Sequence, residues 1–356
     1  MKPNNHIKIP KKRIGVLMVN LGTPEKTDFI NMWKYLREFL SDRRIIELTR
    51  IIWYPILYGI ILIFRPKKSG KLYDSIWDKK NNQSPLKVFT KSIARKLQQK
   101  YKKEKIEIAY AMNYGFPKIQ EELKKLKNNG CERILVFPKI EEELKKLKKN
   151  GCERILIFPM YPQYSATTTA SVSDNVNRYL AKERWQPTIR FVPPYYDDTE
   201  YINTLYNHIK KNLKKSKIKR VLCSFHGIPK KYFFKGDPYH CHCAKTVRLL
   251  NEKFKKEKIK LEMSFQSRFG PQEWLKPYMQ EKMDEFLKES QKDLIVVAPG
   301  FSVDCLETLE EIEIQGKEEF FEKGGTSFNY IKCLNDSEIS INMYSKIINR
   351  ELSGWI

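Results

Sequence analysis

His226 directly follows an apolar segment, residues 220–225 (RVLCSF), and is placed where it could act as a base. The segment has the length and composition of a buried strand. A side chain just past the carboxyl end of a parallel strand lies where open α/β sheets bind their ligands. An imidazole titrates near neutral pH, which suits a general base. A histidine in a loop can equally be structural, and the neighbouring residues leave both interpretations open.

Three carboxylates follow a second apolar segment, residues 293–298 (DLIVVA). Asp304, Glu307 and Glu311 are spaced i, i+3 and i+7, which on an α-helix places them along one face. The helix dipole favours acidic residues in a first turn, so it accounts for Asp304 and Glu307 but not for Glu311. A track of carboxylates that passes on a divalent metal ion or protons explains all three.

The elements that must position these residues alternate regularly along the chain. Apolar segments of strand length alternate with amphipathic helical patterns, which is typical of parallel α/β sheets. A chain of 356 residues exceeds what one core usually supports. We therefore predict two Rossmann-like doubly wound domains with parallel sheets and an active-site cleft between them: 12–184 with a C-terminal helix at 336–356, and 185–335. The expected strands are 15–20, 106–112, 134–138, 155–159, 220–225, 261–266 and 293–298.

The chain is strongly basic, with a formal charge of +25 from 67 basic and 42 acidic residues. Its lysine-rich stretches lack the interleaved aromatic residues that would stack on bases, so nucleic acid is not an expected partner. The charge suits an anionic membrane or ligand. Seven cysteines, an odd number, favour a reducing compartment over a disulfide framework. Residues 1–13 lack the apolar run of a secretory signal, so we expect a cytoplasmic protein.

Residues 51–64 (IIWYPILYGIILIF) form the most apolar stretch and are flanked by basic residues. The stretch contains Pro55 and Gly59 and is shorter than the roughly 20 residues that cross a bilayer. Two interpretations remain. It is either a buried core helix, which the sequence alone slightly favours, or an apolar lip that dips into a membrane interface, which a water-insoluble substrate would favour.

A tandem duplication interrupts the first half. Residues 118–138 and 139–159 match at 18 of 21 positions, and each copy is predicted to be a helix, a glycine turn and a strand. Two copies are too few for a solenoid. We expect the first helix, near 118–128, and the last strand, 155–159, to keep the native connections, and the helix and strand between them to bulge from the domain.

Nine segments in a fixed order resemble the ferrochelatase family over nearly the whole chain. They are VNLGTPE (19–25), FLSDRRII (39–46), RPKKS (65–69) with Tyr73, SPL (84–86), YPQYSATTT (161–169), SFHGIP (224–229), GDPYHCHC (236–243), QSRFGPQEWLKP (266–277) and DCLETLEE (304–311). The resemblance implies a lyase that inserts Fe²⁺ into protoporphyrin IX to form protohaem, the last step of haem biosynthesis. It makes His226 and Glu307 the catalytic and metal-binding residues, and Asp304 and Glu311 the continuation of an acidic path.

The resemblance also implies a porphyrin pocket. An apolar slot and charge partners for the propionates are what such a ligand needs. Its residues would be Leu21, Arg65, Lys68, Tyr73, Ser84, Tyr161, Ser165, Ser267 and Trp274. We expect Fe²⁺ as substrate, no permanent cofactor, and peripheral attachment at the inner face of the membrane.

Three positions depart from the family pattern or need a separate interpretation. Asn113 stands where the family usually has arginine, which puts a charge role there in doubt. Beyond Cys305 only Cys333 remains, so the family's C-terminal iron-sulfur cluster is not expected. The run His240-Cys241-His242-Cys243 has the wrong spacing for a zinc site, and we interpret it as a local loop pattern.

Two other functions remain open. A related chelatase would use another metal or tetrapyrrole, such as cobalt or coproporphyrin. Alternatively, the duplication leaves an inactive homologue that binds porphyrin or membrane.

Overall fold

Two parallel four-stranded sheets organise the molecule. The structure, a computed structural model, describes residues 13–115, 140–213, 218–268 and 270–356. The strand order is β2-β1-β3-β4 in the first sheet and β6-β5-β7-β8 in the second, and all neighbouring strands are parallel. The strands are β1 (Arg13–Gly22), β2 (Ile106–Tyr114), β3 (Cys152–Pro159), β4 (Thr188–Phe191), β5 (Arg220–His226), β6 (Lys260–Gln266), β7 (Asp293–Val297) and β8 (Ser327–Ile331).

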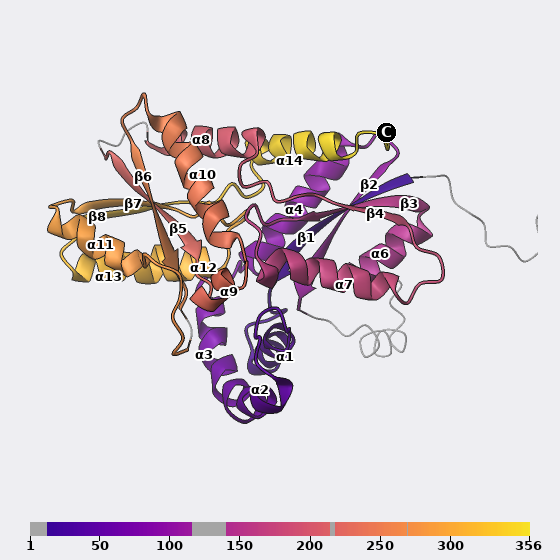
Figure 1. Ribbon diagram of the computed structural model, residues 1–356, viewed down its shortest axis with the longest axis horizontal. Helices are drawn as coiled ribbons and strands as arrows, with labels where there is room; N and C mark the ends of the chain where they lie inside the picture. Colours follow the sequence, from indigo (N-terminus) through magenta and orange to yellow (C-terminus); the bar gives the residue numbers. More distant parts are fainter. Residues whose placement is uncertain (1–12, 116–139, 214–217, 269) are drawn as a thin grey trace, which may run out of the picture.

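Helices surround both sheets, and three segments wind as wider π-helices, labelled η (Figure 1). In the first half these are α1 (Phe29–Leu40), α2 (Arg50–Ile56), η1 (Leu57–Ile61), α3 (Leu62–Ser75), α4 (Pro85–Lys100), α6 (Ile140–Lys149), η2 (Ala166–Ala170) and α7 (Ser171–Leu180). The second half holds α8 (Thr199–Leu213), α9 (Lys230–Phe234), α10 (Tyr239–Phe254), α11 (Met279–Lys288), α12 (Leu306–Thr308), η3 (Leu309–Gly316), α13 (Lys317–Glu322) and α14 (Glu338–Glu351).

Alternating residues of β1 are buried on opposite faces of the first sheet. Val16 and Met18 belong to a cluster that includes side chains of α4 and α14, whereas Leu17 and Val19 pack with α6 and α7. Strands buried on both faces are continuously apolar, which is why their sequence has no polar alternation. The doubly wound α/β fold predicted from the sequence is therefore confirmed.

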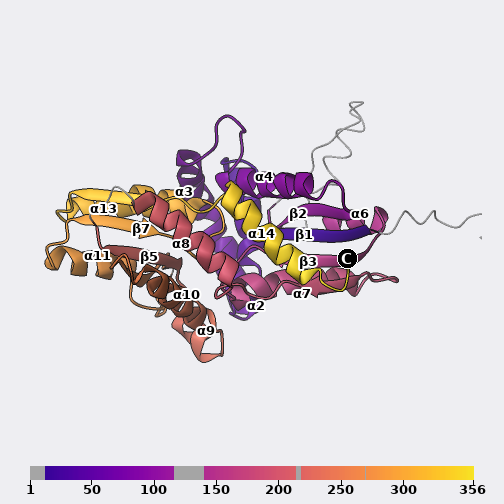
Figure 2. The ribbon, with the colours of Figure 1, turned by 90° about the horizontal axis from the view of Figure 1, so that it is seen from above.

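One core joins the two halves. The cluster on the α4 side of the first sheet continues through α8 and α14 to β5 and α10 of the second half. Figure 2 shows α8 and α14 side by side across the junction of the sheets. The C-terminal helix is also tied to α4, since the Tyr101 hydroxyl donates a hydrogen bond to Asn349 Oδ1 at 2.6 Å. This shared core fixes the position of the carboxyl-end edge of one sheet relative to that of the other.

The strand pairing changes the expected division of the chain. β4 pairs with β3 in the first sheet, although the predicted boundary between residues 184 and 185 would have placed it in the second domain. β4 and β8 were not predicted at all. Both are edge strands of four or five residues that are only partly buried. Such strands lack the long apolar run by which the central strands were recognised.

Residues 51–64 are not a buried core helix, so the interpretation that the sequence slightly favoured is wrong. They run through α2, η1 and the start of α3, which project with α1 from one edge of the molecule (Figure 1). Within this stretch, all of which the structure describes, only Trp53, Leu57 and Leu62 are buried. Ile51 is 89% exposed and Phe64 71%. The segment is an exposed apolar lip, and this name is used for residues 51–64 below.

The second copy of the duplication forms strand β3 of the first sheet and helix α6, which packs on that sheet. α6, residues 140–149, packs against β1, β2, β3 and α7, and β3 lies between β1 and β4. The expectation that the helix before strand 155–159 would bulge from the domain is therefore wrong, whereas the place of strand 155–159 in the sheet is confirmed. The first copy lies outside the described residues, as does the expected strand 134–138.

Deleting either copy is expected to leave a folded protein. The chain without residues 118–138 and the chain without 139–159 differ at three positions, where Gln120, Asn128 and Val136 replace Glu141, Lys149 and Ile157. Ile157 is fully buried, so valine in its place should cost about 0.5–1.5 kcal/mol of unfolding free energy. Urea unfolding followed by circular dichroism measures that difference. A chain that unfolds after either deletion would contradict the interchangeability of the copies.

Candidate active site

The predicted catalytic residues follow the central strands of both sheets. In each sheet the second strand in the sequence lies on one side of the first strand, and the third strand lies on its other side. The edge at which the strand order reverses is a topological switch point. Ligands bind at such points, outside the carboxyl ends of the strands. Leu21 and Tyr161 lie at the switch point of the first sheet, and His226 and Glu307 at that of the second.

The His226 side chain is oriented by a bond to its own loop. Its Nδ1 lies 2.6 Å from the carbonyl oxygen of Gly227. A carbonyl oxygen only accepts hydrogen bonds, so in the neutral imidazole this contact assigns the proton to Nδ1 and the lone pair to Nε2. A side chain at residue 227 would come within 2.9 Å of the Gln266 carbonyl oxygen and 3.2 Å of Trp274. Glycine therefore lets the predicted pocket residue Trp274 pack directly beside the histidine loop.

Glu311 lies close to both Glu307 and His226. Burial, and next the charge of Glu307, raises the pKa of Glu311, while His226 acts in the opposite direction. Glu311 Oε2 accepts hydrogen bonds from the Ser267 hydroxyl and, at 3.2 Å, from Gln266 Nε2. Gln266 also donates to the Glu307 carbonyl oxygen at 2.6 Å. Gln266 was not predicted as a site residue, although it is paired with His226 and ends β6 at the predicted edge.

Replacing Glu311 with glutamine is expected to stabilise the protein at neutral pH. Because the pKa of Glu311 is raised above its ordinary value near 4.5, ionising this carboxyl opposes folding. This loss of unfolding free energy is absent below pH 4.5 and grows as the pH rises to the pKa of Glu311 in the folded state. Glu311→Gln should therefore unfold at higher urea than the parent at pH 7, by on the order of 1 kcal/mol, and the two should converge near pH 4. Equal stability at both pH values would contradict this account.

Asp304 does not share a face with the other two carboxylates, which corrects the predicted track of three. The helix begins only at Leu306, and residues 309–316 are a π-helix. Asp304 Oδ1 accepts hydrogen bonds from the Tyr330 hydroxyl at 2.7 Å and from Thr308, and Oδ2 accepts one from Asn335. Asp304 is 2% exposed and is held by these partners. Its position fixes the turn from which Glu307 projects.

Two tyrosines, Tyr35 and Tyr73, lie close to Glu307, and a third, Tyr161, lies close to Tyr35. The Tyr35 and Tyr73 rings meet edge to face at 6.2 Å, and burial followed in each case by neighbouring charges, Glu307 among them, raises the pKa of both. Burial, and next Tyr35, raises the pKa of Tyr161, whose buried hydroxyl has no hydrogen-bond partner among the described residues. Tyr35 was missed in the sequence. The only available signal was its i, i+4 spacing from Phe39 on a helix.

The cavity that Glu307 lines is narrow in this structure. Leu21, Tyr73 and Ser84 line it together with Glu307, so it contains residues predicted for both catalysis and porphyrin binding. Its volume is about 10 Å³. Sites for ligands of drug size span roughly 300–1,000 Å³. This slot is therefore much smaller than a macrocycle needs.

The remaining predicted pocket residues have different surroundings. Loss of solvation around its guanidinium lowers the pKa of Arg65, and Glu311 opposes this, so the two side chains approach one another. Lys68 is exposed on α3. Ser84 caps α4 by accepting a hydrogen bond from the Lys87 amide. Ser165 is buried, caps η2 and donates to Asp237 of the second half at 3.0 Å. Ser84 and Ser165 thus shape the site through their backbone contacts.

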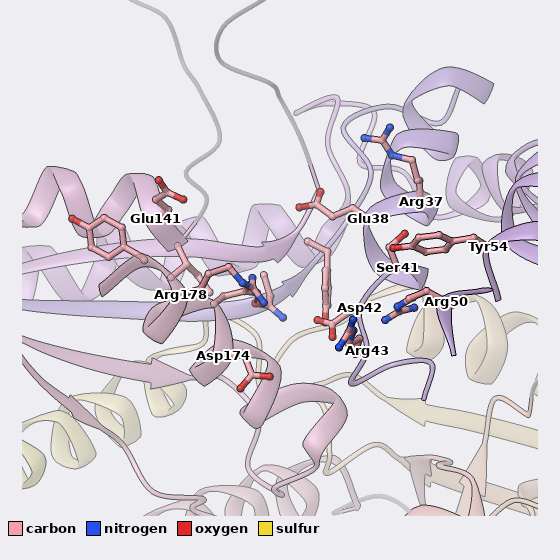
Figure 3. A pocket seen from close by; sticks show the side chains of 15 residues that line it. Arg37, Glu38, Ser41, Asp42, Arg43, Arg50, Tyr54, Glu141, Asp174 and Arg178 are labelled. Carbon is pink, nitrogen blue, oxygen red and sulfur yellow. Dashed lines mark hydrogen bonds between the residues drawn. The ribbon is translucent and has the colours of Figure 1, made fainter. Parts of the chain in front are cut away.

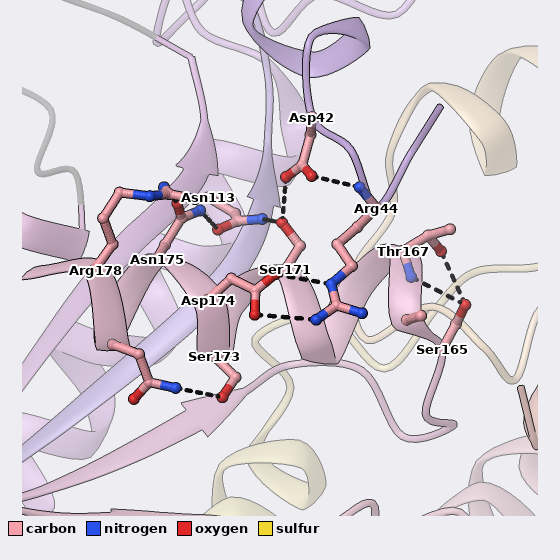
Figure 4. Close-up of polar contacts among 12 residues, drawn as sticks. Asp42, Arg44, Asn113, Ser165, Thr167, Ser171, Ser173, Asp174, Asn175 and Arg178 are labelled. Carbon is pink, nitrogen blue, oxygen red and sulfur yellow. Dashed lines mark hydrogen bonds and ion pairs between the residues drawn. The ribbon is translucent and has the colours of Figure 1, made fainter. Parts of the chain in front are cut away.

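A larger cavity, of about 660 Å³, lies elsewhere among the described residues (Figure 3). It is bordered by α1, α2, β2 and α7, and none of the residues predicted for catalysis or porphyrin binding lines it. Asn113 lies at its edge. Asn113 donates to Ser171 Oγ and accepts from Asn175 Nδ2 at 2.6 Å, and Asn175 in turn accepts from Arg178 (Figure 4). The amide at 113 therefore links the Arg178 guanidinium, through Asn175, to the Asp42 carboxylate, through Ser171.

The run of histidines and cysteines begins helix α10, where the sequence analysis expected a loop. His242 stacks on Tyr196 with ring centres 3.6 Å apart, and its Nδ1 accepts a hydrogen bond from the Tyr164 amide. His240 contacts the Phe265 ring instead. Within the described ranges, no group of three or more histidine, cysteine or acidic side chains is arranged to hold a metal ion.

Comparison with known proteins gives one family. The ferrochelatase family model matches residues 13–140 and 137–352, and the two matches meet at the duplication. A ferrochelatase of Rhizobium meliloti (strain 1021) is 47% identical over 347 residues, which cover 97% of this chain and 96% of the relative. A ferrochelatase of Brucella anthropi is 46% identical over 352 residues, 98% and 94% of the two chains.

Solved structures share the fold at low sequence identity. SirB from Bacillus subtilis, determined with Fe³⁺, has a TM-score of 0.51 and 14% identity, over 76% of this chain and 93% of its own. The sirohydrochlorin chelatase SirB from Bacillus subtilis subspecies spizizenii, in complex with cobalt, has a TM-score of 0.50 and 12% identity, over 96% of both chains. These similarities extend to the two-sheet fold alone.

Proposed function

Because the chain belongs to the ferrochelatase family, lyases that insert Fe²⁺ into protoporphyrin IX to form protohaem, we propose that His226 and Glu307 perform this insertion here. One observation carries the proposal. Glu307 lines a narrow cavity with Tyr35 and Tyr73, and Glu311 lies close enough to both Glu307 and His226 for their charges to act on its pKa.

Metal insertion releases two protons, since Fe²⁺ replaces the hydrogens on two pyrrole nitrogens. In our proposal His226 accepts a pyrrole proton at Nε2, and the bond from Nδ1 to Gly227 keeps that nitrogen facing the site. Glu307 and Glu311 form the acidic path that receives the second proton or hands over the cation. Asp304 acts as a positioning residue, because its own oxygens are already bound.

The porphyrin would occupy the cavity after the α1–α3 segment has moved. Leu21, Tyr73, Tyr161 and Trp274 would pack on the macrocycle, and large apolar contact is what a porphyrin requires. Arg65 and Lys68, on α3, would pair with the propionates. Ser267 would supply a polar contact, and Ser84 and Ser165 would maintain the shape of the wall.

The membrane half of the proposal is carried by the apolar lip. Its exposed large side chains include Ile51, Ile52, Ile56, Ile60, Ile63 and Phe64. An exposed apolar surface of this kind marks a contact with another apolar phase. The helices of the described residues are all too short or too polar to cross a bilayer. We propose a cytoplasmic enzyme that inserts the lip into the inner face of the membrane and takes its poorly soluble substrate there.

The test is formation of haem by the purified protein under anaerobic conditions. Protoporphyrin IX with Fe²⁺ should give the highest kcat/KM, and coproporphyrin III with Fe²⁺ and sirohydrochlorin with Co²⁺ are the comparison substrates. Faster insertion into either comparison substrate would refute the preference for protoporphyrin. Porphyrin binding without any insertion would refute the catalytic roles.

A further inference from the structure

The 660 Å³ cavity lies at the base of the apolar lip and contains four arginines. Arg37 comes from α1, Arg43 from the segment after it, Arg50 from α2 and Arg178 from α7. Figure 3 shows Arg50 and Arg178 reaching toward the cavity from opposite sides. The proposed reaction uses none of these residues.

The four acidic residues around the cavity already have partners. Asp42 accepts from the hydroxyls of Tyr114 and Ser171, both at 2.6 Å, and Asp174 is paired with Arg44 at 2.7 Å. The other two are Glu38, which accepts from the Gly115 amide, and Glu141, which is paired with Lys145. In contrast, Arg37, Arg43, Arg50 and Arg178 form no ion pair with any of the described residues. Asp174 and Glu141 are paired with the cations Arg44 and Lys145, so among the described residues four arginines face only Asp42 and Glu38 as remaining carboxylates.

Arg50 gives the clearest sign of a missing ligand. Both terminal nitrogens of its guanidinium are shielded from solvent and have no hydrogen-bond partner among the described residues. A buried cation without a hydrogen-bond acceptor is costly. A guanidinium forms its strongest bonds with planar or tetrahedral oxyanions, carboxylate and phosphate. The N–H donors of Arg50 that have no acceptor among the described residues thus fit an anionic group.

The surroundings of the cavity show where such an anion would come from. Arg50 and Tyr54 line the cavity, while the neighbouring Ile51 and Ile52 on the same helix are exposed on the lip. Tyr54, Tyr58 and Trp33 form a chain of contacting rings, and Arg37 lies over Trp33. Tyrosine and tryptophan concentrate at the level of lipid headgroups. An apolar tip, a ring of aromatic residues and then arginines is the order in which a bilayer presents acyl chains, glycerol and phosphate.

We propose that this cavity binds the phosphate group of an anionic phospholipid while the apolar lip is inserted in the membrane. The inference rests on the membrane contact proposed above and adds a specific lipid site to it. The arginine nitrogens, with Arg50 foremost, would bind the phosphate oxygens. The cavity would thus select anionic membranes and fix the angle at which the lip enters them.

Sedimentation with vesicles tests the proposal. Vesicles of phosphatidylcholine alone are compared with vesicles in which part of it is replaced by phosphatidylglycerol. The parent protein should bind the anionic vesicles more tightly than the neutral ones. The double variant Arg37→Gln/Arg50→Gln should bind the anionic vesicles about fivefold more weakly for each arginine removed. The control is Arg95→Gln/Arg248→Gln, which removes the same charge from exposed positions outside the cavity. Calorimetry with glycerol 3-phosphate, a soluble headgroup, should show binding to the parent and none to the cavity variant.

A third variant separates this inference from the membrane proposal itself. Ile51→Gln/Ile52→Gln should lose binding to both kinds of vesicle, with unchanged haem formation from detergent-dispersed porphyrin. If that variant binds like the parent, the membrane contact fails. If it loses binding but the cavity and control variants respond equally to phosphatidylglycerol, the lipid site alone is overturned. Binding of glycerol 3-phosphate without any effect of the cavity variant on vesicle binding would likewise overturn it.

Discussion

Replacing His226 with alanine is expected to lower kcat for haem formation by about 10²–10⁴-fold, the usual contribution of a general base. The expectation follows from the bond between Nδ1 and the Gly227 carbonyl, which leaves Nε2 as the basic nitrogen. In the proposed pocket other side chains contact the porphyrin, so the affinity for porphyrin should change little. Anaerobic initial rates measure the first quantity, and quenching of porphyrin fluorescence measures the second.

The matched control for His226→Ala is His226→Asn. The asparagine amide can still donate a hydrogen bond to Gly227, which preserves the loop that Trp274 packs against, but it offers no basic nitrogen. The asparagine variant should fold like the parent and be as inactive as the alanine variant. If it retains most of the activity, His226 orients the loop and is not the base.

Glu307→Gln is expected to reduce kcat/KM for Fe²⁺ by about 10²–10³-fold, because the glutamine amide neither accepts a proton nor attracts a cation. The substitution should also act on its neighbour. The charge of Glu307 raises the pKa of Glu311, so removing it should lower that pKa. Titration of the Glu311 carboxyl followed by NMR gives a result that a merely structural role of Glu307 would not produce.

Glu313→Gln is the control for Glu307→Gln, since Glu313 lies on the same π-helix and pairs with the exposed Lys332. It should leave both the rate and the Glu311 titration unchanged. Loss of activity without any change in the Glu311 titration would contradict the coupling between the two glutamates. Retention of activity by Glu307→Gln would contradict its catalytic role.

The central strands and the edge that carries the site could be predicted because they depend on local sequence. β1, β5 and β7 are apolar runs, and residues that follow such runs gather at one edge of a parallel sheet. His226 and Glu307 were found in this way. Tyr35 reaches the site from a helix that packs there only in the folded protein, and its own neighbours in sequence contain little sign of this.

Other features could not be predicted because non-local contacts determine them. Asp304 leaves the expected helix to bind Tyr330 and Asn335, which are about 30 residues further along the chain. Composition describes how apolar the lip is, but burial depends on whether another element covers it. The choice between the two copies depends on three substitutions, of which only Ile157 is in the core, so the energy difference is small.

The helices of the apolar lip also form a wall of the catalytic slot. α1 and α3 pack on one another, Tyr35 and Tyr73 on these helices line the slot beside Glu307, and α2 and η1 between them carry the exposed tip. Any displacement of the tip relative to the two sheets would therefore change the width of the slot, because the same two helices carry both.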